Sequence, residues 1–248
     1  MISFFKMIFE FFARLLVRPH ISQPVPVTPQ EPVVEAEPEI ELPVGNVLRP
    51  ADLPESNHYA SKDRALLAKE YEYLWAICSV PEKWVDECAR AANKAMINID
   101  KYKYVEKMTK VPWYFVAAVH YREASQDFRT CLHNGDRLPG PTVHVPAGRG
   151  PFESWEDAAI DALTCEGFAG KSDWSLGTVF ARLEAYNGFG YRTGRMQETT
   201  PLNASPYIYN GTQFYVKGRS IEDHSWYPES VDDQLGCMAF LKELGIKF

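Results

Sequence analysis

The chain has 248 residues, of which 46% are hydrophobic and 13% aromatic, so it is long and apolar enough to bury a core. Its net charge of −7 argues against a general nucleic-acid-binding protein, which would normally present a basic face, and no nucleic acid is expected as a partner. The five cysteines are odd in number and include no CxxC pair, which argues against a zinc ribbon and against a disulfide framework.

Residues 1–18 (MISFFKMIFEFFARLLVR) predict an amphipathic, membrane-proximal helix. The charged residues Lys6, Glu10 and Arg14 are four apart and therefore share one helical face, whereas the rest is mostly apolar. The segment is shorter than the roughly 20 largely uncharged residues that span a membrane. We expect it to lie on a membrane or to dock on a protein partner; an uncleaved signal-anchor and a helix folded back on its own domain are the alternatives.

Residues 19–56 predict an acidic, disordered linker. They hold nine of the 18 prolines and carry a net charge of −6. Such a composition favours an extended tether without a core of its own. The compact domain is therefore expected to cover residues 57–248.

The first half of this domain predicts four helices in succession. Ser61 is placed to cap a helix over 61–77, and Pro81 stands at the first turn of a second helix over 81–99. A third helical segment covers 100–110, and Pro112 opens an apolar helix over 112–124.

The second half continues mainly helical, with one small β excursion. Residues 141–150 (PTVHVPAGRG) predict a short hairpin or a loop. Helices are expected over 154–168, over 174–187 with Asn187-Gly188 as the C-terminal signal, and over 228–245. Residues 197–228 are rich in Pro, Asn, Gly and Tyr and predict a long structured loop. The fold class is mainly α (α+β) with a small β-hairpin.

The helix over 112–124 ends on a carboxylate, Glu123. Residues 113–119 leave it no polar face, so it should be buried in the middle of the domain. Glu123 then lies beside apolar mass and near the negative end of the helix dipole, and both effects raise the pKa of the carboxyl group. A raised pKa suits a general acid working near neutral pH. The alternative is a buried ion pair with Arg122 or another base.

A polar loop with further acids follows this helix. Asp127 and Asp136 lie 4 and 13 residues after Glu123. A loop can bring one of them opposite Glu123, and two carboxylates about 6.5–9.5 Å apart would fit an inverting glycosidase, which holds a water molecule between them. The alternative is that Asp136, in the sequence HNGD, only shapes a turn.

The order of these motifs resembles the lysozyme-like superfamily. Goose-type lysozymes and lytic transglycosylases carry a catalytic glutamate at such a helix end and a later Tyr-Asn-Gly motif, here Glu123 and the stretch LEAYNGFGY. The closer resemblance is to phage and bacterial endolysin-like proteins. It covers roughly residues 58–245 and runs through VPWYFVAAVHYREASQDFRTCLHNGD, TVHVPAGRG, RLEAYNGFGYR and SPYIYNGTQFYVKGR.

The resemblance implies a lysozyme-like domain and roles for individual residues. Glu123 would be the catalytic acid and Asp136 a second catalytic residue that orients water. The candidate substrate-binding residues are Tyr186, Asn187, Gly188, His133, Ser125 and Tyr191. Many relatives have a serine directly after the glutamate, whereas this chain has Ala124 before Ser125, so Ser125 would approach a sugar from a different direction.

Sugar rings stack on aromatic side chains, so an aromatic wall is also expected. Four aromatic residues of the long loop are its candidates, and each taken singly is more often core or rim: Tyr207, Tyr209, Tyr215 and Trp226.

The implied function is a peptidoglycan hydrolase (an endolysin-like muramidase) that cleaves the β-1,4 bond between N-acetylmuramic acid and N-acetylglucosamine. Peptidoglycan strands would be its partner, without a cofactor or metal, at the cell envelope or delivered by a phage. A lytic transglycosylase and a non-catalytic glycan-binding or structural protein are alternatives. A zinc hydrolase is a weaker one, since no HxxxH or HExxH pair is present. Its ligands would come from His120, His133, His144 and His224, with Asp136 or Cys131.

Overall fold

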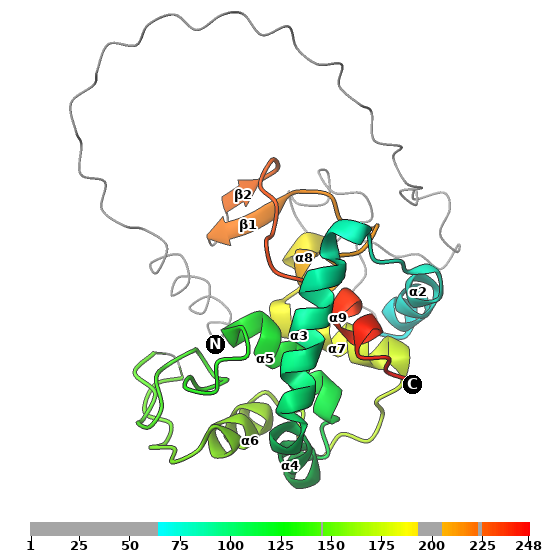
Figure 1. Cartoon of the computed structure of the whole chain (residues 1–248). Coiled ribbons are helices and arrows are strands. Elements are labelled where there is room, and N and C mark those ends of the chain that lie inside the picture. The colour runs from blue at the N-terminus through cyan, green and yellow to red at the C-terminus, as the bar shows by residue number, and fades with distance from the viewer. Residues whose placement is uncertain (1–63, 145, 193–204, 223–224) are drawn as a thin grey trace, which may run out of the picture.

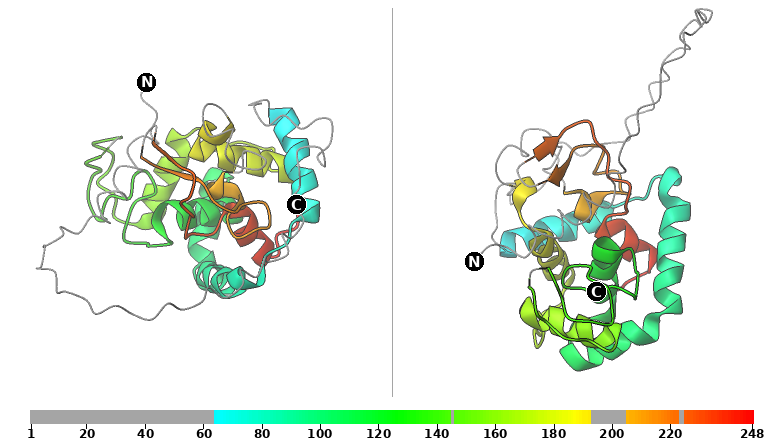
Figure 2. Two further views of the ribbon diagram at one scale, coloured as in Figure 1. Left: turned by 90° about the horizontal axis from the view of Figure 1, so that it is seen from above. Right: turned by 90° about the vertical axis from the view of Figure 1, so that its left-hand side faces the viewer.

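Helix α5 (Trp113–Ala124) lies in the middle of the domain. Nine of its 12 residues are buried, and Figure 2 shows α5 and α9 (Cys237–Glu243) with the other helices around them. A helix without a polar face has to be enclosed on all sides, so the prediction of a buried helix over 112–124 is confirmed. Pro112 precedes its first residue, and Ser125 ends it in the left-handed conformation with φ of 49°.

The computed structural model describes residues 64–144, 146–192, 205–222 and 225–248. The predicted helix 1–18, the linker 19–56 and the start of the compact domain near residue 57 lie outside the described residues. Ser61, the expected cap of the first helix, does so as well.

The described chain is mainly helical, as predicted (Figure 1). Before α5 come α2 (Arg64–Ile77), η2 (Glu82–Trp84), α3 (Val85–Ile97) and α4 (Ile99–Thr109). After it come α6 (Trp155–Cys165), α7 (Leu176–Asn187), η3 (Gly190–Arg192), α8 (Pro206–Tyr209), β1 (Arg219–Glu222), β2 (Ser225–Tyr227) and α9. In Figure 1, α3 runs along the front of the domain, with α4 and α6 at one end and the β1–β2 pair at the other. None of the described helices is long and apolar enough to cross a membrane.

The two-stranded sheet lies where a loop was predicted. Strands β1 and β2 pair antiparallel, with Ser220 opposite Trp226, inside the segment 197–228. The described residues of 141–150 form a loop and no strand, so of the two structures expected there the loop is the one found. The reason is that the amides of the adjacent residues Val143 and His144 both donate to the carboxylate of Asp136, whereas in an extended strand successive amides point to opposite sides.

The predicted last helix over 228–245 is wrong in its first half. Helix α9 begins only at Cys237, and the residues before it form a loop. Two carbonyl groups of this loop, those of Gln234 and Leu235, accept hydrogen bonds from Arg122. In a helix these carbonyls would accept hydrogen bonds from backbone amides one turn later. Here they bind the buried guanidinium group of Arg122, which is distant in sequence, and the segment stays a loop. All five cysteines are free thiols.

Helices α2 and α7 pack closely because Gly177 of α7 has no side chain. A Cβ atom at Gly177 would lie 2.5–2.6 Å from the carbonyl oxygen, Cα and Cβ of Ala68. Gly177→Ala is therefore expected to lower the free energy of unfolding by about 1–3 kcal/mol through overpacking, despite the better helix propensity of alanine. Urea unfolding measures this effect. An unchanged or increased midpoint would show that the contact does not constrain the two helices.

Candidate functional site

Glu123 lies in the last turn of α5 and is only 8% exposed. Its Oε1 atom accepts a hydrogen bond of 3.0 Å from the hydroxyl group of Tyr207, which belongs to α8. Its Oε2 atom accepts no hydrogen bond from the described residues and is not one of the fully enclosed polar atoms among them. One carboxylate oxygen is therefore held in place, while the other is able to exchange a proton.

Burial penalises the charged form of Glu123 and raises the pKa of its carboxyl group from 4.5 to about 7. The hydrogen bond from Tyr207 and the positive charge of Arg122 lower this pKa, whereas the negative charge of Glu166 raises it. A carboxyl group with such a pKa populates both protonation states at neutral pH. This property is the one that a general acid requires.

Arg122 does not form the ion pair with Glu123 that was considered as an alternative. Its guanidinium group binds the carboxylate of Asp232 at 3.1 Å and the carbonyl oxygens of the loop before α9. It also lies over the ring of Tyr207, 5.0 Å from the centroid. Within the described part of the chain, Glu123 has no cationic side chain bound to it, so it is not the anionic half of a structural salt bridge.

Tyr207→Phe is expected to raise the pKa of Glu123, because the hydroxyl group that stabilises the carboxylate is lost while the apolar surroundings stay. A ¹³C NMR titration of the Glu123 carboxyl carbon measures the change. Tyr215→Phe is the matched control, since the Tyr215 hydroxyl bonds to Gly218 and Asp232 instead. An unchanged or lowered Glu123 pKa in Tyr207→Phe would contradict the assignment of this hydrogen bond.

Asp136 lies in the loop after α5, and both oxygens of its carboxylate accept hydrogen bonds from this loop. The carboxylate accepts bonds from the amide nitrogens of Val143 (2.8 Å) and His144 (3.0 Å), and it contacts Nδ1 of His144 at 2.5 Å. Burial alone raises the pKa of Asp136, but these hydrogen bonds outweigh it and the net pKa is lowered. The turn-shaping role considered for Asp136 is thus present, and its role with water stays a prediction.

The Tyr-Asn-Gly motif places its tyrosine beside Glu123. Tyr186 is buried, its hydroxyl group donates to the carbonyl of Leu132 at 3.5 Å, and the charge of Glu123 adds to the effect of burial in raising its pKa. Asn187 donates from Nδ2 to the Ser205 hydroxyl at 3.4 Å. Gly188 ends α7 with φ of 91°, a conformation that favours glycine, so the predicted helix end is confirmed.

The other three predicted sugar contacts lie in different surroundings. The side chain of Ser125 is exposed next to Glu123, and its carbonyl accepts a bond from Lys94. His133 is fully buried, so a sugar contact by it gains no support from this placement. Tyr191 is 7% exposed, and its hydroxyl group accepts a hydrogen bond from the Ser220 amide.

The four aromatic residues expected in one wall separate into different places. Tyr207 contacts Glu123, and Trp226 packs edge-on against Tyr191 with 5.9 Å between ring centroids. Tyr209 is enclosed in the core, where it stacks on Tyr71, and Tyr215 is buried with its hydroxyl group bonded to backbone. Three of the four, Tyr207, Tyr209 and Tyr215, are therefore core residues, and Trp226 is half-buried.

The histidines considered as zinc ligands do not converge in the described structure. His120 is buried, its Nδ1 atom bonds to the Tyr102 hydroxyl at 3.0 Å, and burial lowers its pKa to about 3. His144 contacts Asp136, and His224 lies outside the described residues.

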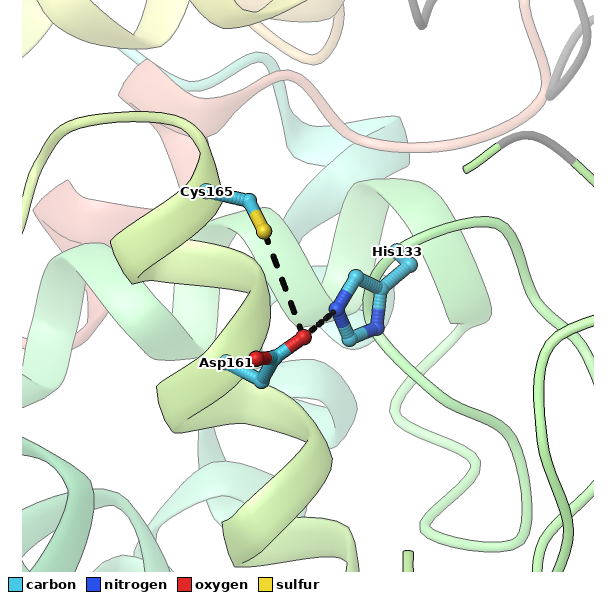
Figure 3. A group of neighbouring side chains, drawn as sticks. All are labelled: His133, Asp161 and Cys165. Atoms are coloured by element: carbon cyan, nitrogen blue, oxygen red, sulfur yellow. Dashed lines mark hydrogen bonds and ion pairs between the residues drawn. The ribbon is translucent and has the colours of Figure 1, made fainter. Parts of the chain in front are cut away.

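One different group of metal-ligand types does occur among the described residues: His133, Asp161 and Cys165 (Figure 3). His133 Nε2 lies 2.7 Å from Asp161 Oδ2, and Cys165 is one helical turn along α6. Arg149, however, binds both oxygens of the same carboxylate, so a cation there would have to displace a guanidinium group. The arrangement is best described as an ion-pair network that ties the loop to α6.

A residue absent from the sequence-based candidates, Glu166, is the second carboxylate near Glu123. It caps the C-terminal end of α6, it is half-buried, and its charge acts on both Glu123 and Tyr186. Burial raises the pKa of Glu166. No local signal marked it, because Glu166 lies inside the helix expected over 154–168, whereas in the structure it ends α6 at the negative pole of the helix dipole, as Glu123 does for α5.

No family model matches the chain, and no match to it was found among curated proteins or solved structures.

Proposed function

We propose that this protein is a peptidoglycan hydrolase with a lysozyme-like domain, and that it cleaves the β-1,4 bond between N-acetylmuramic acid and N-acetylglucosamine. The observation that carries the proposal is the Glu123 carboxyl group. It stands at the end of an apolar helix, has a pKa of about 7 and takes part in no ion pair among the described residues. The motifs that resemble lysozyme-like enzymes place Glu123 in the role of the catalytic acid.

In the proposed reaction Glu123 protonates the glycosidic oxygen of the leaving sugar. The step needs a carboxyl group that still holds its proton near neutral pH, which burial provides here. The hydrogen bond from Tyr207 fixes one oxygen and stabilises the carboxylate that remains after proton transfer. The resemblance assigns sugar binding to Tyr186, and the effect of the Glu123 charge on its hydroxyl group supports a role for both residues in one site.

The substrate implies an environment. Peptidoglycan lies in the cell envelope, so the protein would work there or be brought there by a phage. An amphipathic helix over residues 1–18 would hold it at a membrane or on a protein partner, with residues 19–56 as the tether.

Digestion of purified peptidoglycan by the full chain, followed by mass spectrometry of the soluble products, tests the proposal. Hydrolysis releases fragments with reducing N-acetylmuramic acid ends. Fragments with 1,6-anhydro ends would instead identify a lytic transglycosylase, in which Glu123 acts as acid and then base and the sugar's own 6-hydroxyl attacks. If no soluble fragment appears while the protein still binds the polymer, the non-catalytic alternative holds and the proposal is wrong.

A further inference from the structure

Glu166 is placed firmly at the end of α6. The amides of Phe168 and Ala169 both donate to the carbonyl of Leu163, and Gly167 adopts φ of 71°, so the chain turns sharply after the helix. The Glu166 side chain is half-buried, and its carboxylate forms no hydrogen bond or ion pair within the described part of the chain. A sheltered carboxylate without a partner is uncommon and marks a candidate functional group.

The turn after Glu166 packs against the helices that carry the candidate site. Phe168 stacks on Tyr186 of α7, with 5.9 Å between ring centroids and 20° between planes. Phe168 also packs against Phe115 of α5, with 5.3 Å between the ring centroids. These two contacts hold the end of α6 against the helix that ends in Glu123 and against the tyrosine beside it.

The carboxyl groups of Glu123 and Glu166 and the hydroxyl group of Tyr186 come from the ends of three different helices and lie near one another. The charge of Glu166 acts on Glu123, and the charges of both carboxylates act on the hydroxyl group of Tyr186. Glu123 and Glu166 share no hydrogen bond, so they are neighbours without direct contact. An inverting glycosidase requires two carboxyl groups that are close but not in contact, because a water molecule and a sugar have to fit between them.

Asp136 meets the chemical requirement for a base less well than Glu166. Its carboxylate is occupied by the amides of Val143 and His144 and by the His144 ring, and its pKa is lowered, which makes it a weaker base. The Glu166 carboxylate has no such partners, and burial makes it a stronger base.

We propose that Glu166 is the second catalytic carboxylate and that it activates the water molecule that attacks the anomeric carbon. This inference rests on the proposed hydrolysis of peptidoglycan. In the step, Glu166 takes a proton from water while the water oxygen bonds to the anomeric carbon. The bond from that carbon to the glycosidic oxygen breaks, and the oxygen receives the proton of Glu123. Glu166 then returns its proton to solvent, and Glu123 takes one up.

The test compares Glu166→Gln with Asp136→Asn and adds sodium azide as a substitute nucleophile. Glu166→Gln is expected to lose at least about 100-fold in the rate of fragment release, with its circular dichroism spectrum unchanged. Azide needs no base, so it should restore turnover of Glu166→Gln and yield a glycosyl azide with inverted configuration. Glu153→Gln removes an exposed carboxylate just before α6 and is expected to retain full activity.

The outcomes separate this inference from the proposed function. If the wild-type protein releases no fragments, the proposed function fails. If the wild type is active but Glu166→Gln is equally active, or if azide rescues only Asp136→Asn, the assignment of Glu166 is wrong while that of Glu123 stands. Products with 1,6-anhydro ends would also overturn the role of Glu166, because no water is then activated.

Discussion

Glu123→Gln is expected to reduce the release of soluble peptidoglycan fragments by at least about 100-fold, because general acid catalysis contributes about 10²–10⁴ in rate. Glutamine has nearly the same shape and can still accept the hydrogen bond from Tyr207, but it cannot donate a proton to the leaving oxygen. The measurement is the initial rate of clearing of a peptidoglycan suspension, with product masses as confirmation. A variant that clears the suspension at the wild-type rate would remove Glu123 from the mechanism.

The same substitution is expected to stabilise the fold at alkaline pH. The pKa of Glu123 is raised from 4.5 to about 7, so between these values the native state keeps a proton that the unfolded chain has lost. Stability contributed by this group is therefore full below about pH 4.5 and is lost as the pH rises to about 7. Removing the charge should make Glu123→Gln more stable than the wild type above pH 7, by about 3 kcal/mol at 1.36 kcal/mol per pKa unit.

Urea unfolding at pH 4.5 and pH 8 measures this difference. The gain should be large at pH 8 and small at pH 4.5, where the wild-type carboxyl is protonated in the native state and about half protonated in the unfolded chain. Glu153→Gln, at an exposed position, should show no gain at either pH. Equal effects of Glu123→Gln at the two pH values would show that the carboxyl group of Glu123 is not destabilised by burial.

The central helix and its carboxylate were predictable because the signals are local. Residues 113–119 have no polar face, which by itself requires enclosure on all sides, and Pro112 marks the start. The raised pKa of Glu123 follows from the same apolar run. The end of α7 was equally predictable, since the pair Asn187-Gly188 is a local signal for the end of a helix.

What was missed depends on contacts between residues far apart in the chain. Tyr207 reaches Glu123 across 84 positions, and no pattern near either residue indicates that hydrogen bond. Of the hairpin or loop expected over 141–150 the loop is found, and the choice depends on Asp136, a side chain outside that segment that binds the amides of Val143 and His144. Glu166 was not among the candidates because its sequence does not show where it lies. Its place near the site follows from the packing of its neighbour Phe168 on Tyr186, a contact between residues distant in sequence.

The core also contains a charge network that the sequence did not indicate. Arg192 of η3 is 1% exposed and binds Glu184 of α7 through Nε at 2.7 Å and Glu70 of α2 through Nη2 at 2.7 Å. The Tyr71 hydroxyl donates to Glu184 as well. Burial raises the pKa of Glu184 to about 7, and the charge of Arg192 limits this rise. One cation thus compensates two buried carboxylates and connects three elements.

Arg192→Met is expected to lower the free energy of unfolding by about 3–5 kcal/mol at pH 7, because it leaves Glu70 and Glu184 buried without a cation. The loss should be smaller at pH 4.5 than at pH 7, since Glu184, whose pKa is raised to about 7, is protonated at the lower pH and then carries no uncompensated charge. Chemical denaturation at pH 4.5 and pH 7 measures both effects.

Two further variants show whether this loss comes from the buried charge. Lys217→Met breaks an exposed ion pair with Glu229 and should cost less than about 1 kcal/mol. Combining Arg192→Met with Glu70→Gln and Glu184→Gln should recover much of the stability, because the network is then neutral throughout. If this triple variant is less stable than Arg192→Met alone, packing of the arginine stem rather than its charge holds α2, α7 and η3 together.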